Sequence, residues 1–84
     1  MHVTVVSPER AVFDGAADAI VAPAYDGQVG VLPHHAPFLT LLGTGVLLVR
    51  QGSASSRFHV SGGFLQVVGG GDAVRIVADR VDAA

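Results

Sequence analysis

Lysine and cysteine are both absent from this 84-residue chain, and charge is scarce, with five basic and seven acidic residues. Without lysine the chain has no P-loop and no amine for Schiff-base chemistry. The same absence excludes a carrier domain that attaches biotin or lipoate to a lysine. Without cysteine there is no disulfide, thiolate metal site, iron–sulfur cluster or cysteine nucleophile. These absences remove several enzyme classes before any motif is considered.

The remaining composition is apolar, with half of the residues hydrophobic and a net charge of −2. An apolar chain with so little charge is not disordered, and a slightly acidic one is not a typical nucleic-acid binder. The length predicts a single domain over residues 1–84. A domain of this size buries only about 60–65% of its unfolded surface. We therefore expect part of the apolar surplus to face a partner.

One uncharged stretch, from Gly27 to Val49, is long enough to cross a bilayer. It contains Pro33 and Pro37 around paired histidines, which would leave backbone groups unsatisfied in lipid. We therefore expect no direct membrane insertion. The first residues also lack a basic leader followed by an apolar block, so the default expectation is a cytoplasmic setting.

Glycine, proline and aspartate recur every several residues and separate short β-branched or aromatic runs. No window of helical length combines a helical period with freedom from glycine and proline. The pattern predicts an all-β fold, a flattened two-sheet β-sandwich of about ten short strands. Strands are expected at residues 3–6, 11–13, 18–22, 28–31, 38–42, 46–50, 57–60, 64–68 and 73–79, with Gly62-Gly63 as a turn.

Two of these runs alternate as half-buried strands do. Phe58 and Val60 share one face, and Val74, Ile76 and Ala78 share another. By contrast, residues 46–49 are apolar on both faces. We expect that strand either to lie between layers or to have one face covered by another chain.

The adjacent His34 and His35 are the only metal-like feature. A metal site needs three or four converging ligands, and His2 and His59 fall on separate strands. We interpret the pair as loop histidines that face solvent or hold a backbone carbonyl. A serine nucleophile elbow is excluded because His59 stands where Ser61 would need a glycine. We predict no catalytic residue, no cofactor and no metal.

Three segments, residues 6–15, 23–37 and 60–68, together resemble one family. The middle one has the form G-x-x-G-x-L-P-x-H-A-P, and S-G-G-F follows about 25 residues later. The chain is similar to the amino-terminal domain of the epsilon subunit of F-type ATP synthases, called delta in mitochondria. The resemblance implies a ten-stranded flattened sandwich, in agreement with the strand pattern.

The resemblance also implies a role. It indicates a non-catalytic subunit of the central rotor of a proton-translocating ATP synthase, docked on the gamma subunit and on the polar loops of the membrane c-ring. This subunit couples ion flow to ATP synthesis at the cytoplasmic face of the cell membrane. The alternative is a free-standing sandwich that binds a small ligand or a metal through His34 and His35.

The resemblance also implies which residues face the c-ring and which face gamma. The loop around Gln28, Val29 and Gly30 faces the c-ring in this family, often with an acidic residue where this chain has Gln28. Positions matching Ser7, His35 and Thr40 lie toward gamma, and we add Leu47, from the strand that is apolar on both faces.

Most family members continue into a carboxy-terminal hairpin of two helices that restrains ATP hydrolysis. This sequence stops at Ala84, where the expected sandwich ends. The expectation is a subunit that couples and docks but lacks the inhibitory arm, unless the sequence is a piece of a longer protein.

Overall fold

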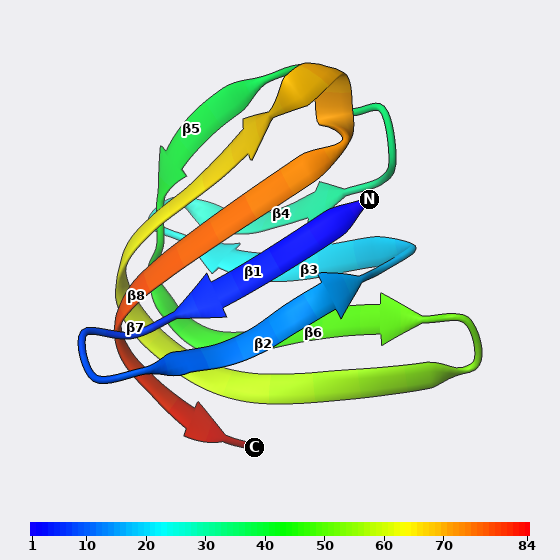
Figure 1. Ribbon diagram of the computed structural model, residues 1–84. Coiled ribbons are helices and arrows are strands. Elements are labelled where there is room, and N and C mark those ends of the chain that lie inside the picture. The colour runs from blue at the N-terminus through cyan, green and yellow to red at the C-terminus, as the bar shows by residue number, and fades with distance from the viewer.

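The computed structural model describes residues 1–70 and 72–84, and nearly all of them lie in strands (Figure 1). The elements are β1 (His2–Val6), β2 (Ala11–Ala16), β3 (Ala19–Ala24), β4 (Gly27–Val31), β5 (Phe38–Leu41), β6 (Thr44–Gln51), β7 (Ala54–Val68), the 3-10 turn η1 (Gly69–Gly71) and β8 (Ala73–Ala83). The all-β prediction is confirmed. No helix in the described part of the chain has the length and apolarity to cross a membrane.

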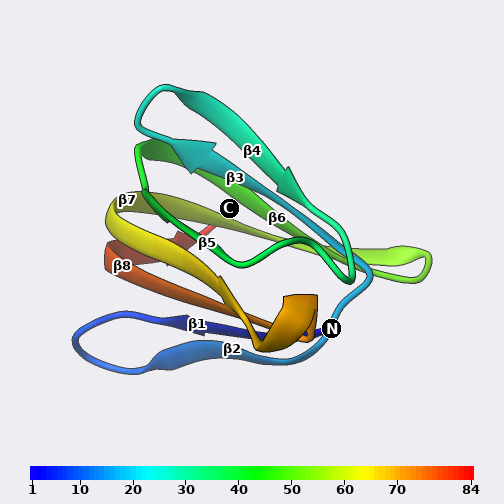
Figure 2. The ribbon, with the colours of Figure 1, turned by 90° about the horizontal axis from the view of Figure 1, so that it is seen from above.

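The strands form one continuous sheet in the order β2-β1-β8-β7-β6-β3-β4, with β5 attached to β7. The sheet folds over itself, because β7 and β8 bend and run through both layers (Figure 2). The first layer contains β2, β1, the start of β8, the end of β7, and β5. The second contains the end of β8, the start of β7, β6, β3 and β4. Each layer therefore has five strand segments, although the chain forms eight strands rather than about ten.

The count differs because Gly62-Gly63 is not the predicted turn. Both residues lie inside the 15-residue β7 with positive φ, 68° and 102°, a conformation open to glycine. Here β7 exchanges one neighbour, β6, for another, β5, while its register with β8 is unchanged. A Cβ on Gly63 would overlap the Val77 carbonyl oxygen. The two glycines therefore bend a strand at the corner of the sandwich instead of ending it.

The core lies between the layers and follows the predicted alternation. Val60, Val74, Ile76 and Ala78 are buried, and Phe58 is half-buried against them. The largest side chains with no exposed surface come from both layers: Leu47 and Val49 from β6, Leu65 from β7, and Ile76 from β8. Each fully buried aliphatic side chain contributes about 1.5–3 kcal/mol of transfer free energy.

Candidate partner-binding surfaces

The outer face of the first layer carries an apolar strip that crosses four strands. On β5, Leu39 and Leu41 alternate with residues that face the core, and their side chains are 64% and 61% exposed. Leu41 is opposite Phe64 on β7, which is opposite Val77 on β8. Val77 in turn is paired with Val6 on β1. We call Leu39, Leu41, Phe64, Val77 and Val6 the apolar strip.

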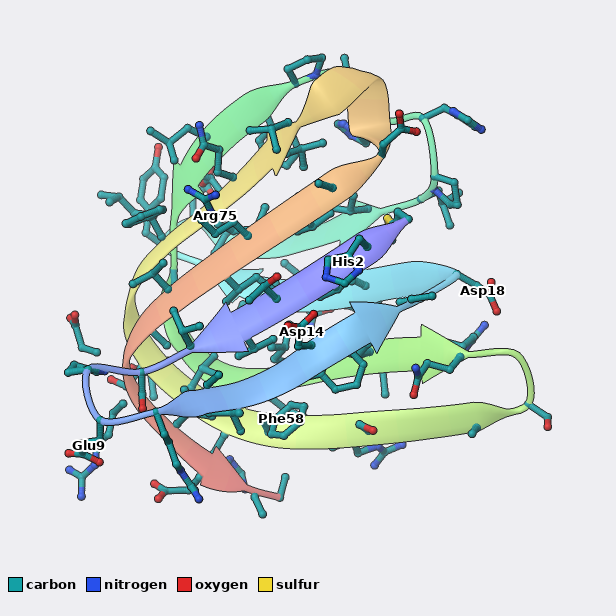
Figure 3. The ribbon with its side chains drawn as sticks, viewed as in Figure 1. His2, Glu9, Asp14, Asp18, Phe58 and Arg75 are labelled. Atoms are coloured by element: carbon teal, nitrogen blue, oxygen red, sulfur yellow. The ribbon has the colours of Figure 1, made fainter. Side chains whose placement is uncertain are left out.

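Polar side chains border this strip on the same face. The adjacent row places Gln66 opposite Leu39 and Arg75 opposite Gln66. The row continues through Thr4 on β1 to Asp14 on β2. Figure 3 shows Arg75 and Asp14 on this side of the sheet. An apolar centre with a polar rim is the usual anatomy of a protein–protein interface.

The turn between β3 and β4 extends the apolar surface. Tyr25 in this turn is 69% exposed, and its backbone N–H donates to the Leu41 carbonyl at 3.1 Å. That bond holds the turn of one layer beside the end of β5 in the other. Leu39, Leu41 and Phe64, with Thr40 and Gln66, also line a shallow groove at this place.

The outer face of the second layer is different, because it carries charged side chains over β7 and β8. Cross-strand pairing places His59 opposite Asp82 and Arg57 opposite Leu48, and Arg57, His59 and Asp82 are all exposed.

This face also has apolar surface, because Val46 is 40% exposed and Leu32, just after β4, is 63% exposed. Leu32 lines a groove there with Val21, Leu48 and Arg50. The second layer therefore mixes charged and apolar side chains, whereas the apolar strip of the first layer contains no charged residue.

The three predicted c-ring residues lie together on β4, an edge strand paired only with β3. Gln28 and Gly30 are exposed. Val29 is half-buried and packs against the core. The strand carries no charged side chain over Gly27–Val31.

The four predicted gamma residues do not lie on one surface. Ser7 directly follows Val6 of the apolar strip, and its Oγ donates to the Arg10 carbonyl at 3.3 Å across the β1–β2 turn. Thr40 lies on β5 between the two exposed leucines. His35 lies in the β4–β5 loop, which Figure 1 places at the opposite end of the sandwich from the β1–β2 turn. Ser7 thus borders the strip, Thr40 faces the core from the opposite side of β5, and His35 is at a distance from Ser7.

Leu47 is in the wrong place for a partner contact. Its side chain has no exposed surface, because the alternation of β6 points Leu47 and Val49 into the core. The outward positions of that run are Val46 and Leu48. The run is apolar on both faces because one face is core and the other is only partly exposed.

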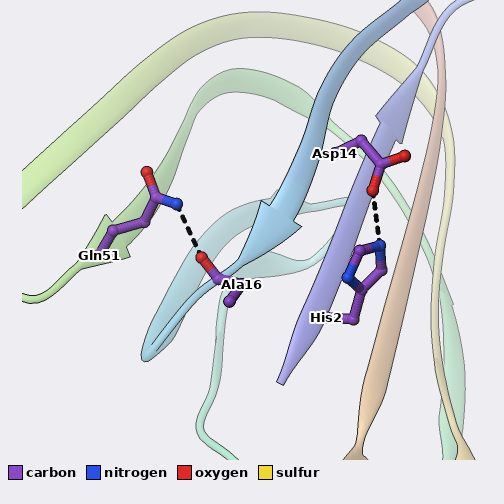
Figure 4. A network of polar contacts seen from close by, with 4 residues as sticks. All are labelled: His2, Asp14, Ala16 and Gln51. Atoms are coloured by element: carbon purple, nitrogen blue, oxygen red, sulfur yellow. Dashed lines mark hydrogen bonds and ion pairs between the residues drawn. The ribbon is translucent and has the colours of Figure 1, made fainter.

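His2 and His35 make separate polar contacts. His2 Nε2 is 2.6 Å from Asp14 Oδ1 on the neighbouring strand, and close by Gln51 Nε2 donates to the Ala16 carbonyl at 2.7 Å (Figure 4). His35 Nδ1 is 2.8 Å from the Ala36 carbonyl oxygen, as expected for a loop histidine holding a backbone carbonyl. In residues 1–70 and 72–84, no three His, Cys, Asp or Glu side chains gather into a potential metal site.

The comparison with known protein families accounts for the whole chain. The family model described as "ATP synthase, Delta/Epsilon chain, beta-sandwich domain" matches residues 1–84. The chain belongs to this family. The family resemblance read from the three sequence segments is confirmed, and so is the β-sandwich class.

Relatives of this epsilon-type domain differ in length. An ATP synthase epsilon chain of Desulforamulus reducens is 41% identical over 80 residues, covering 95% of this chain and 59% of that one. One from Leptospira borgpetersenii is 42% identical over 67 residues, covering 80% and 53%. One from Caulobacter vibrioides is 40% identical over 85 residues, covering 100% and 96%. This chain therefore spans little more than half of the first two relatives and nearly all of the third.

Solved structures share the fold of the epsilon-type domain at low identity. A chain in the mitochondrial ATP synthase of Euglena gracilis superposes with a TM-score of 0.87 and 24% identity, over 96% of this chain and 51% of that one. A chain in the central stalk and c-ring structure of Tetrahymena thermophila superposes with a TM-score of 0.79 and 21% identity, over 98% and 65%. These likenesses confirm the fold.

Sequence reasoning missed the two outward leucines of this epsilon-type domain. The run 38–42 was recognised as a strand, and the uncharged stretch containing it was a candidate for surplus apolar surface. The one polar residue of the strand, Thr40, lies on the core-facing side, so alternation of polar and apolar residues points to the wrong face as the exposed one. Since apolar residues occupy both faces of 38–42, periodicity alone could not tell which face is exposed.

Proposed function

We propose that this chain is a non-catalytic docking domain of the central rotor of an F-type ATP synthase, folding as one unit over residues 1–84. It binds the gamma subunit with one surface and the polar loops of the c-ring with another, and so couples ion flow through the ring to ATP synthesis. The observation that carries the proposal is the apolar strip on a domain whose full length matches the delta/epsilon family.

Gamma binds the outer face of the first layer. The strip offers the exposed Leu39 and Leu41 beside the half-buried Phe64, with a polar rim. The outer face of the second layer carries the exposed charges of Arg57 and Asp82 beside its apolar groove. Interface centres are depleted in charge, which favours the first layer. Ser7 at the end of the strip belongs to this contact, and His35 to its far margin. Thr40 faces the core between Leu39 and Leu41 and contributes only by positioning these two leucines.

The c-ring binds at β4, through Gln28, Val29 and Gly30. The similar Tetrahymena chain is part of a structure of a central stalk and c-ring. The shared fold supports a contact with the c-ring for this chain too. The polar loops of a c-ring suit an uncharged, exposed strand edge. The complex lies at the cytoplasmic face of the plasma membrane.

The test is association of the purified 84-residue chain with its cognate partners. Calorimetry against the purified gamma subunit, and co-sedimentation with the detergent-solubilised c-ring, measure the two contacts separately. Saturable binding to gamma at one-to-one stoichiometry is the expected result. No association with gamma at micromolar concentrations of both proteins would refute the proposal.

A further inference from the structure

The backbone orientation of β4 is fixed by its neighbours. The Pro23 carbonyl of β3 accepts from the Gly43 N–H at 2.9 Å, so Pro23 turns its backbone away from β4. Gln28 is the register partner of Pro23. When two facing residues of neighbouring antiparallel strands do not hydrogen-bond to each other, the N–H and C=O groups of each residue point away from the other strand. Gln28 therefore turns its N–H and C=O toward the open edge of the sheet.

The hairpin gives the same orientation independently. Two residues, Tyr25 and Asp26, connect β3 to β4, and the pair Ala24–Gly27 closes the hairpin. The closing pair of a two-residue hairpin is hydrogen-bonded, and the pattern then alternates. Gln28 and Gly30 are both non-bonded positions in this pattern, so two successive sets of backbone groups face outward.

The other edges of the sandwich are each partly protected. Along β2, the Gln51 side chain donates to a backbone carbonyl. At β5, the Leu41 carbonyl accepts from the Tyr25 N–H. The end of β8 carries the exposed charges of Arg80 and Asp82, which discourage strand pairing.

By contrast, β4 carries no charge, proline or bulge, and a Cβ added at Gly30 would meet no atom within 4 Å. An open, uncharged edge is a template for another strand unless something covers it.

We propose that a c-ring loop recognises β4 through its backbone: the loop's backbone forms hydrogen bonds with the N–H and C=O groups of Gln28 and Gly30. The inference rests on the proposed function and adds the mode of recognition. Two outward-facing residues spaced two apart offer about 7 Å of pairing edge, which suits a short loop. Since Gln28 has no charge, this contact does not need an ion pair.

The experiment compares three variants for binding to the purified c-ring in detergent. Gly30→Pro removes the N–H that faces the open edge and leaves every hydrogen bond between β3 and β4 in place. The affinity of this variant for the c-ring should fall about fivefold or more. Gly30→Ala keeps the N–H and adds a methyl group into open space, and Gln28→Ala removes the side-chain amide. Both should bind within about twofold of the parent chain. Circular dichroism and binding to gamma check that each variant is folded.

Amide hydrogen exchange tests the same point without a substitution. In the free chain, Gln28 and Gly30 should exchange rapidly while Val29 and Val31 are protected. Adding the c-ring should slow Gln28 and Gly30 specifically.

Three outcomes would overturn the inference while leaving the proposed function intact. They are unchanged ring binding by a folded Gly30→Pro chain, no added protection at these two amides on ring binding, and a fivefold loss with Gln28→Ala alone. Dimerisation of the parent chain that Gly30→Pro abolishes would also overturn it, by assigning the edge to a second copy. Absence of both ring and gamma binding by the parent chain would instead refute the proposed function.

Discussion

Leu41 and Leu47 form a matched test of which apolar surface serves the partner, because the same substitution should have opposite effects at the two positions. Leu41 is 61% exposed on the outer face, whereas Leu47 has no exposed surface. Leu47→Ala leaves a cavity between the layers, and such cavities cost about 2–5 kcal/mol of unfolding free energy. Leu41→Ala removes a side chain that is mostly in water, so stability should change by no more than about 0.5 kcal/mol.

Binding should show the reverse order. An exposed leucine at this level presents roughly 100 Å² to solvent, which is worth about 2.5 kcal/mol if a partner covers it completely. Partial coverage makes about 1–2 kcal/mol a realistic loss for Leu41→Ala, or roughly 5–30-fold in affinity for gamma. The double variant with Leu39→Ala should lose more than either single variant, although neighbouring positions need not add.

The assays are urea unfolding followed by circular dichroism, and calorimetric titration with the gamma subunit. Both variants are measured under the same conditions as the parent chain. If folded Leu41→Ala binds gamma as tightly as the parent chain, and the Leu39 and Leu41 double variant does too, the assignment of the apolar strip to gamma is wrong. If the Leu47→Ala variant has the same urea midpoint as the parent chain, Leu47 is not in the core of the sandwich.

Three further predictions concern stability. Gly63→Ala should lower the unfolding free energy by at least about 2 kcal/mol, because the positive φ disfavours alanine and the added Cβ would overlap the Val77 carbonyl oxygen. A urea midpoint equal to that of the parent chain would contradict the corner geometry. The exposed His2–Asp14 pair should contribute less than about 1 kcal/mol in a double-mutant cycle, and a larger coupling would mean a partly shielded pair. Gln51→Ala should cost about 0.5–1.5 kcal/mol by removing one hydrogen bond, with an unchanged thermal midpoint arguing against it.

The sequence was sufficient for the fold class and for most strand positions. Seven of the nine expected runs each correspond to one strand, because glycine, proline and aspartate mark the ends of β-branched segments. The other two runs, 57–60 and 64–68, are both parts of β7. The exception was Gly62-Gly63. A glycine pair signals positive φ equally well in a hairpin turn and in a strand bend. Only the long-range pairing of β7 with β8 distinguishes the two.

Site residues were harder to predict, for a related reason. Leu47 and Leu41 are identical residues in uncharged, largely apolar runs, and their environments differ only through the pairing of distant strands. Residues with polar neighbours were placed better, as with His35 on its backbone carbonyl. Side-chain alternation gives two faces, but which face meets the other layer is a property of the assembled sheet.

The bend in β7 and β8 gives the proposed rotor function a mechanical basis. The apolar strip belongs to the first layer and the open edge of β4 to the second. These two surfaces are connected by strands that pass through both layers without a break in register, and not by side-chain packing alone. A load applied to β4 is therefore transmitted through the β3–β6–β7 ladder to the strands that carry the strip. A joint that transmits torque between two partners requires such rigidity, and the glycine corner provides it by letting one strand belong to both layers.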